Sequence, residues 1–149
     1  MSKVLTVTDF VLTSAYDSTV KALRSLDGVE EYVDGTDLSD ETLKAYAQPL
    51  ARALNGAEHW MHSAHRDIWL ALHHYVTDVS EERMLRDELL PIIVDAWDAI
   101  VAARSALNKD SLADFRTATL AMTTSLRDDS VKVDRLQARY RASTNHSLE

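Results

Sequence analysis

The chemically most suggestive feature of the sequence is a run of histidines, because five of the six histidines lie within the segment 59–74. At about 100° per residue on a helix, Glu58, His62, His65 and His73 fall within a stripe about 80° wide. One helix would then present a carboxylate and several imidazoles at successive turns. These groups bind zinc, iron, nickel or copper. The spacing therefore predicts a transition-metal site at these four residues.

Other roles for this histidine stripe stay open. One helix seldom completes a coordination sphere, so a metal site would need ligands from a second helix. The Glu-x-x-His motif of di-iron bundles and the His-Glu-x-x-His motif of zinc proteases are both absent. The histidines could form a cluster that titrates near about pH 6.5, or supply an axial haem ligand beside Met61, Met84 or Met122. We favour a structural role, as half-buried or solvated helix residues.

Tryptophan is the second residue type that suggests a function, since exposed tryptophan is enriched in protein interfaces. On a helical projection Trp69 falls among the histidines, whereas Trp60 points well away from them. Trp97 belongs to a later segment. Packing in the core or at its edge is the alternative for each of them. Of the three, we expect Trp60 to be the most exposed and a candidate interface residue.

A long helical segment is expected to carry these side chains. Apolar residues step by three and four along 40–79 without a slip, which predicts one interrupted helical arm that begins at Ser39 or Asp40. Pro49 lies inside the arm. Proline lacks a backbone donor and clashes with the preceding turn, so we expect a kink or a break there.

The same spacing predicts helices on both sides of this arm. A first helix begins near Thr8 or Asp9 and ends at an Asp-Gly pair, and 28–38 then forms a connecting loop. A third helical region covers about 81–107, and Pro91 should bend it.

A fourth helix begins at Asp110 or Ser111, and only Thr119 and Asp129 interrupt its apolar stripe. The whole chain has 3 glycines and 2 prolines, which leaves few turns and favours long elements. We therefore predict an all-α, up-and-down bundle of about four long amphipathic helices.

Length and composition limit the class of protein. A chain of 149 residues fits a single domain, and the final Leu148-Glu149 resembles a cloning remnant. The absence of cysteine excludes disulfides and thiolate metal sites. The sequence has no apolar run that would span a bilayer or act as a signal peptide, so we expect a cytoplasmic protein without a membrane partner. Its use of Ala, Asp, Arg and Val suggests a GC-rich bacterium or its phage.

The charge of the chain is strongly acidic, with a formal net charge of -8. This balance argues against direct nucleic-acid binding, which needs cations that displace phosphate counterions. Much of the excess lies in the segment 27–41, which has acids but no base. A solvated connection is the simple explanation. A decoy that occupies a nucleic-acid-binding protein is a weaker alternative.

No nucleophile elbow, phosphate-binding loop or other catalytic motif is visible, so we assign no catalytic residue. We expect a non-enzymatic interaction or regulatory module that acts through its helix faces, as a homodimer or with another protein, because spare apolar stripes usually pair with a partner. The alternative function is a metal carrier or metalloenzyme that uses the histidine stripe.

Overall fold

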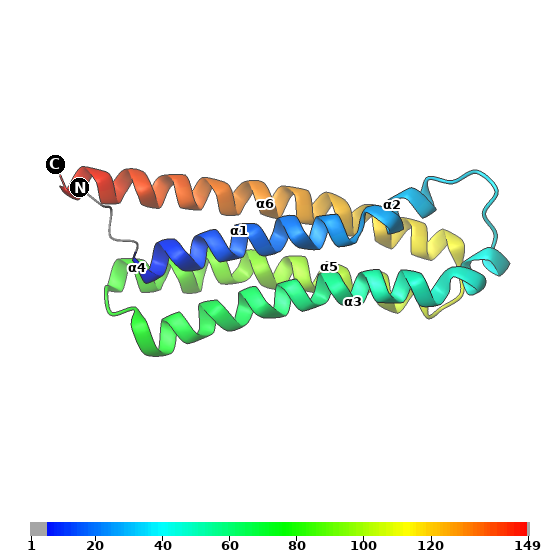
Figure 1. Ribbon diagram of the computed structural model, residues 1–149, viewed down its shortest axis with the longest axis horizontal. Helices are drawn as coiled ribbons and strands as arrows, with labels where there is room; N and C mark the ends of the chain where they lie inside the picture. The colour runs from blue at the N-terminus through cyan, green and yellow to red at the C-terminus, as the bar shows by residue number, and fades with distance from the viewer. Residues whose placement is uncertain (1–5, 149) are drawn as a thin grey trace.

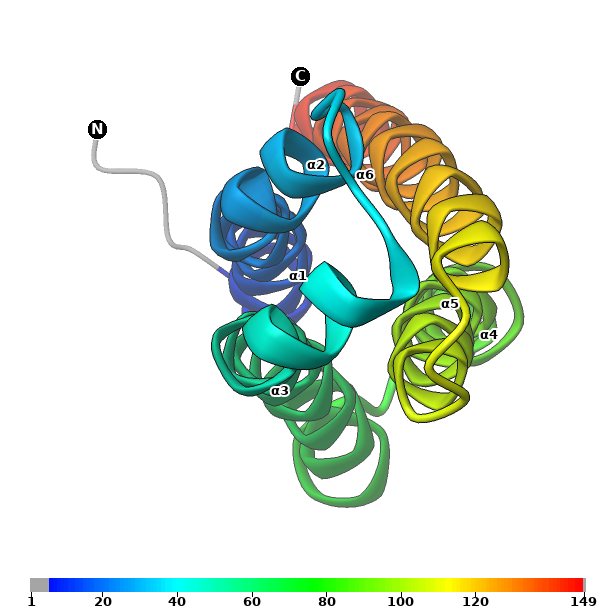
Figure 2. The same cartoon turned by 90° about the vertical axis from the view of Figure 1, so that its right-hand side faces the viewer.

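Four long helices run along the molecule in alternating directions, as the predicted up-and-down bundle requires (Figure 1). The computed structural model describes residues 6–148 and the side chains as far as residue 144. The four helices are α1 (Val7–Ser25), α3 (Asp40–Leu70), α5 (Leu90–Leu107) and α6 (Leu112–Leu148). Viewed from one end, they lie in the cyclic order α1, α3, α5, α6 around a common core (Figure 2). The all-α bundle prediction is confirmed.

Side-chain caps fix where the helices begin. The Oγ1 of Thr6 accepts a hydrogen bond from the backbone of Asp9, so α1 starts before the predicted Thr8 or Asp9. Ser39 caps α3 and forms a reciprocal pair of bonds with Thr42, which confirms that predicted start. Each cap satisfies backbone donors that the first turn of a helix leaves without a partner.

The predicted loop over 28–38 is wrong in its first half, because a short helix α2 (Asp27–Val33) follows α1 directly. Gly28 has no positive φ and lies inside α2, so it does not adopt the left-handed conformation that commonly ends a helix. The buried pair Val29 and Val33, four residues apart, packs α2 onto the bundle.

The two prolines act differently. Pro49 lies inside α3, which continues through it without a break, so the predicted break is absent there. Pro91 occupies the first turn of α5 and follows a π-helical segment, η2 (Leu85–Leu89), that joins α5 to the short helix α4 (Val79–Met84). Because proline removes a donor and crowds the carbonyl four residues earlier, a widened turn before Pro91 relieves the clash. The predicted irregularity near Pro91 is confirmed in this form.

A second π-helical segment, η1 (Ala71–Tyr75), ends the α3 arm, which stops short of the predicted residue 79. Both π-helical segments lie at the same end of the bundle, where α1 begins and α6 ends (Figure 1). Such segments are often found at functional sites. The two π-helical segments therefore make this end of the molecule a candidate location for a functional site.

The apolar core divides into two clusters. On α6, Leu126 belongs to one cluster, Val133 belongs to the other, and Asp129 lies between them. On α1 the buried polar residues Ser18 and Thr19 occupy the corresponding interval. The Asp129 carboxyl is 1% exposed and its Oδ2 has no hydrogen-bond donor. Burial, together with the neighbouring carboxyl of Asp95 on α5, raises its pKa to about 7.

Parts of the acidic stretch 27–41 stabilise the fold. The Glu30 carboxylate pairs with Arg127 of α6, and the Asp40 carboxylate accepts a hydrogen bond from the backbone of Leu112. Within residues 6–148, no helix is long and apolar enough to cross a membrane. Of the C-terminal pair singled out in the sequence, Glu149 lies outside the described residues.

Candidate interaction surface

Glu58, the acid of the histidine stripe, already has polar partners within the bundle. Glu58 forms an ion pair with Arg104 of α5, and its Oε1 accepts a hydrogen bond from the indole of Trp97 at 3.1 Å. These contacts join α3 to α5 and give Glu58 a structural role. A metal bound by Glu58 would have to compete with the Arg104 guanidinium.

The structure brings His62 and His65 together on the indole of Trp97, with ring centroids 5.5 and 5.6 Å away. His73 lies farther along and packs on Trp69 instead, at 4.2 Å. Within the described residues, no group of three or more histidine or acidic side chains is placed to hold a metal ion. Metal binding by the four predicted ligands stays a prediction, and ring packing accounts for what the structure places there.

The expectation that Trp60 is the most exposed tryptophan is wrong, because Trp69 is 49% exposed whereas Trp60 is half-buried. The ammonium of Lys21 lies 4.6 Å from the centre of the Trp60 ring and covers it. Trp60 nevertheless lies between α1 and α3, on the surface described next. Its predicted role as an interface residue stays a prediction.

An apolar groove opens between the start of α1 and the end of α3. Its volume is about 250 Å³. Its lining residues, which define the Phe10 groove, are Val7, Phe10, Val11, Asp67, Leu70, Ala71 and Tyr75. Phe10 and Tyr75 are 62% and 67% exposed, although both are large and apolar. Neither side chain belongs to the core clusters, so the fold itself does not account for their placement.

A second groove lies between α2 and α3, past the end of α1. Its volume is about 380 Å³. Its lining residues, which define the Tyr46 groove, are Gly28, Val29, Glu31, Tyr32, Tyr46, Pro49, Leu50 and Ala53. Tyr46 is 54% exposed and packs against Tyr32, with ring centroids 5.5 Å apart. Aromatic rings at the rim of an apolar groove are typical of protein-binding surfaces.

Small residues join the two grooves. Between them α1 and α3 contact each other at Ser25 and Gly56, where a Cβ added to the glycine would lie 3.8 Å from the Ser25 Oγ. The side chain of Ser14 donates a hydrogen bond to Asp67 at 2.9 Å across the same line. We use the name α1–α3 seam for the line along which α3 packs against α1 and α2, with one of the two grooves at each end. Along α3, Leu70 and Pro49 lie about 30 Å apart at 1.5 Å per residue.

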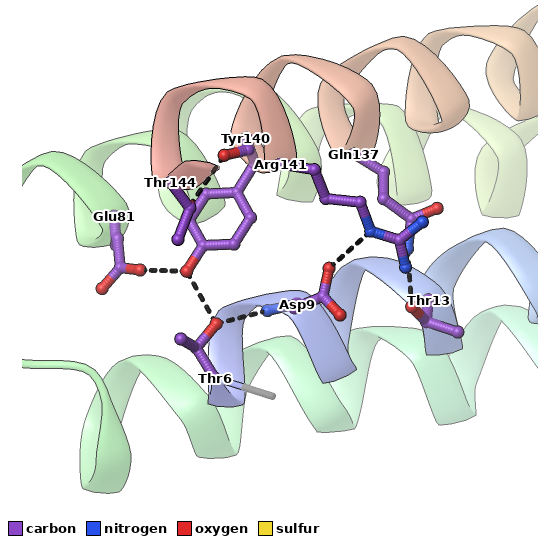
Figure 3. A network of polar contacts seen from close by, with 8 residues as sticks. All are labelled: Thr6, Asp9, Thr13, Glu81, Gln137, Tyr140, Arg141 and Thr144. Carbon is purple, nitrogen blue, oxygen red and sulfur yellow. Dashed lines mark hydrogen bonds and ion pairs between the residues drawn. The ribbon is translucent and has the colours of Figure 1, made fainter. Parts of the chain in front are cut away.

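A polar network holds the first turn of α1, and with it one wall of the Phe10 groove. The Tyr140 hydroxyl lies 2.6 Å from the Oγ1 of Thr6 and donates a hydrogen bond to Glu81 of α4 (Figure 3). One turn farther on, Arg141 of α6 pairs with the buried Asp9 at 2.9 Å. Burial, reinforced by the bond to Glu81, raises the pKa of Tyr140, so the phenol stays a neutral donor.

A pocket of about 620 Å³ lies beside this network and has a different character. Side chains of both charge signs line it, and several of them neutralise one another. Arg139 pairs with Glu88 at 2.6 Å, and Glu81 accepts the Tyr140 hydroxyl. Because its lining presents acids and bases together, the charge of this pocket favours no single ligand class. In the two apolar grooves, by contrast, the exposed aromatic side chains are not covered by other residues that the structure describes.

A sequence signal for the seam exists beside the core stripe of α3. It is a second row with three-four spacing, formed by Tyr46, Pro49, Ala53, Gly56, Trp60, Ser63, Asp67 and Leu70. Because this row mixes aromatic, small and polar residues, it does not form a recognisable apolar stripe. Only Trp60 was singled out from the sequence, on the basis of its direction.

Comparison of the chain with protein-family models, with curated proteins and with solved structures finds no match.

Proposed function

We propose that the protein is a non-enzymatic helical interaction module that binds another protein helix along the α1–α3 seam. The observation that carries the proposal is the pair of apolar grooves along α3, one beside α1 and the other beside α2. Clusters of exposed apolar residues usually mark binding sites, because exposing them to water is unfavourable. Phe10, Tyr46 and Tyr75 lie outside the core clusters, so a partner is the simplest reason for their presence at the surface.

The geometry of the seam favours a helix as the bound element. The ridge of a third helix fits along the line where α3 packs against α1 and α2, with an apolar groove at each end. An amphipathic helix about 20 residues long would reach from one groove to the other. It would place an apolar anchor near Phe10 and another near Tyr46, with a close approach at Gly56.

Selection from an unbiased library of helical peptides tests this proposal. We expect the recovered peptides to be amphipathic, and to lose affinity by about tenfold or more for a Phe10→Ser/Tyr46→Ser double variant, since hydrophobic anchors dominate such interfaces. Both side chains are mostly exposed, so the variant should fold normally.

Leu120→Ser is the matched control, because Leu120 is also 54% exposed but lies on α6. The proposal is wrong if no peptide is recovered, or if the recovered peptides respond to Leu120→Ser and not to the double variant.

A further inference from the structure

We propose that the partner of the α1–α3 seam is a basic amphipathic helix, with Lys or Arg beside its apolar anchor at each end and no cation at its midpoint. This inference rests on the proposed function and adds the charge pattern of the partner. Three features of the seam support it: the acids in its two grooves, the cation at its midpoint, and the repulsion that a second copy of the chain would meet.

Each groove contains a single charged residue, and in both cases it is an acid. Asp67 lines the Phe10 groove and Glu31 lines the Tyr46 groove, while neither lining includes a Lys or an Arg. Apolar walls around a carboxylate favour a partner that brings both an apolar side chain and a cation.

In the part of the chain that the structure describes, these two acids are not neutralised by a basic side chain of the bundle, in contrast to several other acids. Glu58, Asp9 and Glu88 each form an ion pair with an arginine of another helix. Among the described side chains, no Lys or Arg pairs with Asp67 or Glu31, and Asp67 accepts a hydrogen bond only from Ser14. The acids of the seam are thus available to an incoming cation.

The midpoint of the seam carries a positive charge, opposite to the charge of the two grooves. Lys21 lies over the ring of Trp60 between the two grooves, so a cation of the partner would meet a like charge there. A matching helix therefore has basic residues towards its two ends and a small neutral or acidic residue at its centre. The two basic positions of the partner helix are about 30 Å apart, and this spacing fixes the register of the partner on the seam.

A second copy of this chain fits the seam less well. In an antiparallel dimer across the seam, the Phe10 groove of one copy would face the Tyr46 groove of the other. Asp67 and Glu31 would then approach each other in a partly dry interface, where like charges repel strongly. The net charge of -8 on each copy adds to the repulsion.

Three labelled synthetic peptides of about 21 residues test the inference. They share one apolar stripe and a central Ala, and they differ only in having Lys, Gln or Glu at the flanking positions of both ends. Fluorescence anisotropy measures their affinity for the full-length protein. We expect the Lys peptide to bind about tenfold more tightly than the Glu peptide, with a difference that shrinks as salt is added.

An Asp67→Asn/Glu31→Gln double variant should remove most of this preference. The matched control is Asp98→Asn/Asp134→Asn, which makes the same change in net charge at exposed residues of α5 and α6. Equal affinity for the three peptides, or an equal loss of preference in the control, would overturn the charge pattern while leaving the seam a binding surface.

Two further outcomes separate the remaining explanations. Concentration-dependent dimers in light scattering, dispersed by Phe10→Ser, would show that a second copy occupies the seam, and would overturn the basic partner. Failure of all three peptides to bind, without dimers, would contradict the proposed function as well as this inference.

Discussion

Replacement of Asp129 with asparagine is expected to raise the free energy of unfolding at about pH 8 by several kcal/mol, at most about 4 kcal/mol, and to change it little at about pH 4. The Asp129 carboxyl is 1% exposed, and its pKa is raised to about 7 by burial and by Asp95. Asparagine has nearly the same shape and keeps a donor for Asp95, but it never ionises.

The sign of this change in the free energy of unfolding follows from the protons that Asp129 binds in the folded and unfolded states. The unfolded chain releases the Asp129 proton near the ordinary pKa of 3.8, whereas the folded chain keeps it until about pH 7. Between these values the folded state binds more protons, so the stability of the wild-type protein falls as the pH rises. Above about pH 7 the folded state must hold a buried carboxylate, opposed by Asp95 and Asp128 and only partly offset by Lys132.

Urea unfolding at a series of pH values measures this difference. Asp128→Asn is the control, because that neighbouring carboxylate is exposed and pairs with Lys132. A difference between the wild type and Asp129→Asn that stays constant with pH would show that Asp129 does not hold a proton in the folded bundle.

Replacement of Gly56 with glutamine is expected to raise the stability of the fold and to weaken the binding of the partner helix. Gly56 lies inside α3 without a positive φ, so its backbone does not require glycine. A better helix former there should raise the free energy of unfolding by about 0.5–1 kcal/mol. The added side chain would project into the midpoint of the seam and should weaken the binding of the Lys peptide by about tenfold, since overpacking an interface is costly.

Thermal unfolding and peptide anisotropy measure these two effects on the same sample. Gly56→Ala should keep the gain in stability with a smaller loss of affinity, because a Cβ has only an ordinary contact with Ser25. Ala102→Gln, on the exposed face of α5, is the control for an added glutamine. A more stable Gly56→Gln protein that binds as tightly as the wild type would show that the partner does not contact the midpoint.

Helical periodicity predicted the bundle because the buried side chains of each long helix recur every three or four residues, as from Leu54 to Ile68 of α3. Short-range signals were less reliable. The Asp27-Gly28 pair suggested a helix end, but packing of Val29 and Val33 overrides the weak propensity of glycine. Pro49 suggested a break, yet α3 contacts α1 and α5 along its length and remains one helix.

The candidate surface could not be predicted in the same way, because a groove depends on which faces of two helices meet. Phe10 and Tyr75 are far apart in the sequence and line one groove only because α1 and α3 are antiparallel neighbours. The histidine row was visible in the sequence, but its packing on Trp97 depends on the position of α5. The polar interruption at Asp129 was also visible, while the proximity of Asp95 that raises its pKa was not.

Chemical-shift mapping by NMR is the most direct test of the claim that the α1–α3 seam binds a helix. Titration of the isotopically labelled full-length protein with the Lys peptide should shift the amide signals of α1 and α3 around both grooves, including those of Phe10, Gly56 and Tyr46. The outward faces of α5 and α6 should change little. Shifts confined to α5 and α6, or spread evenly over the bundle, would contradict the account.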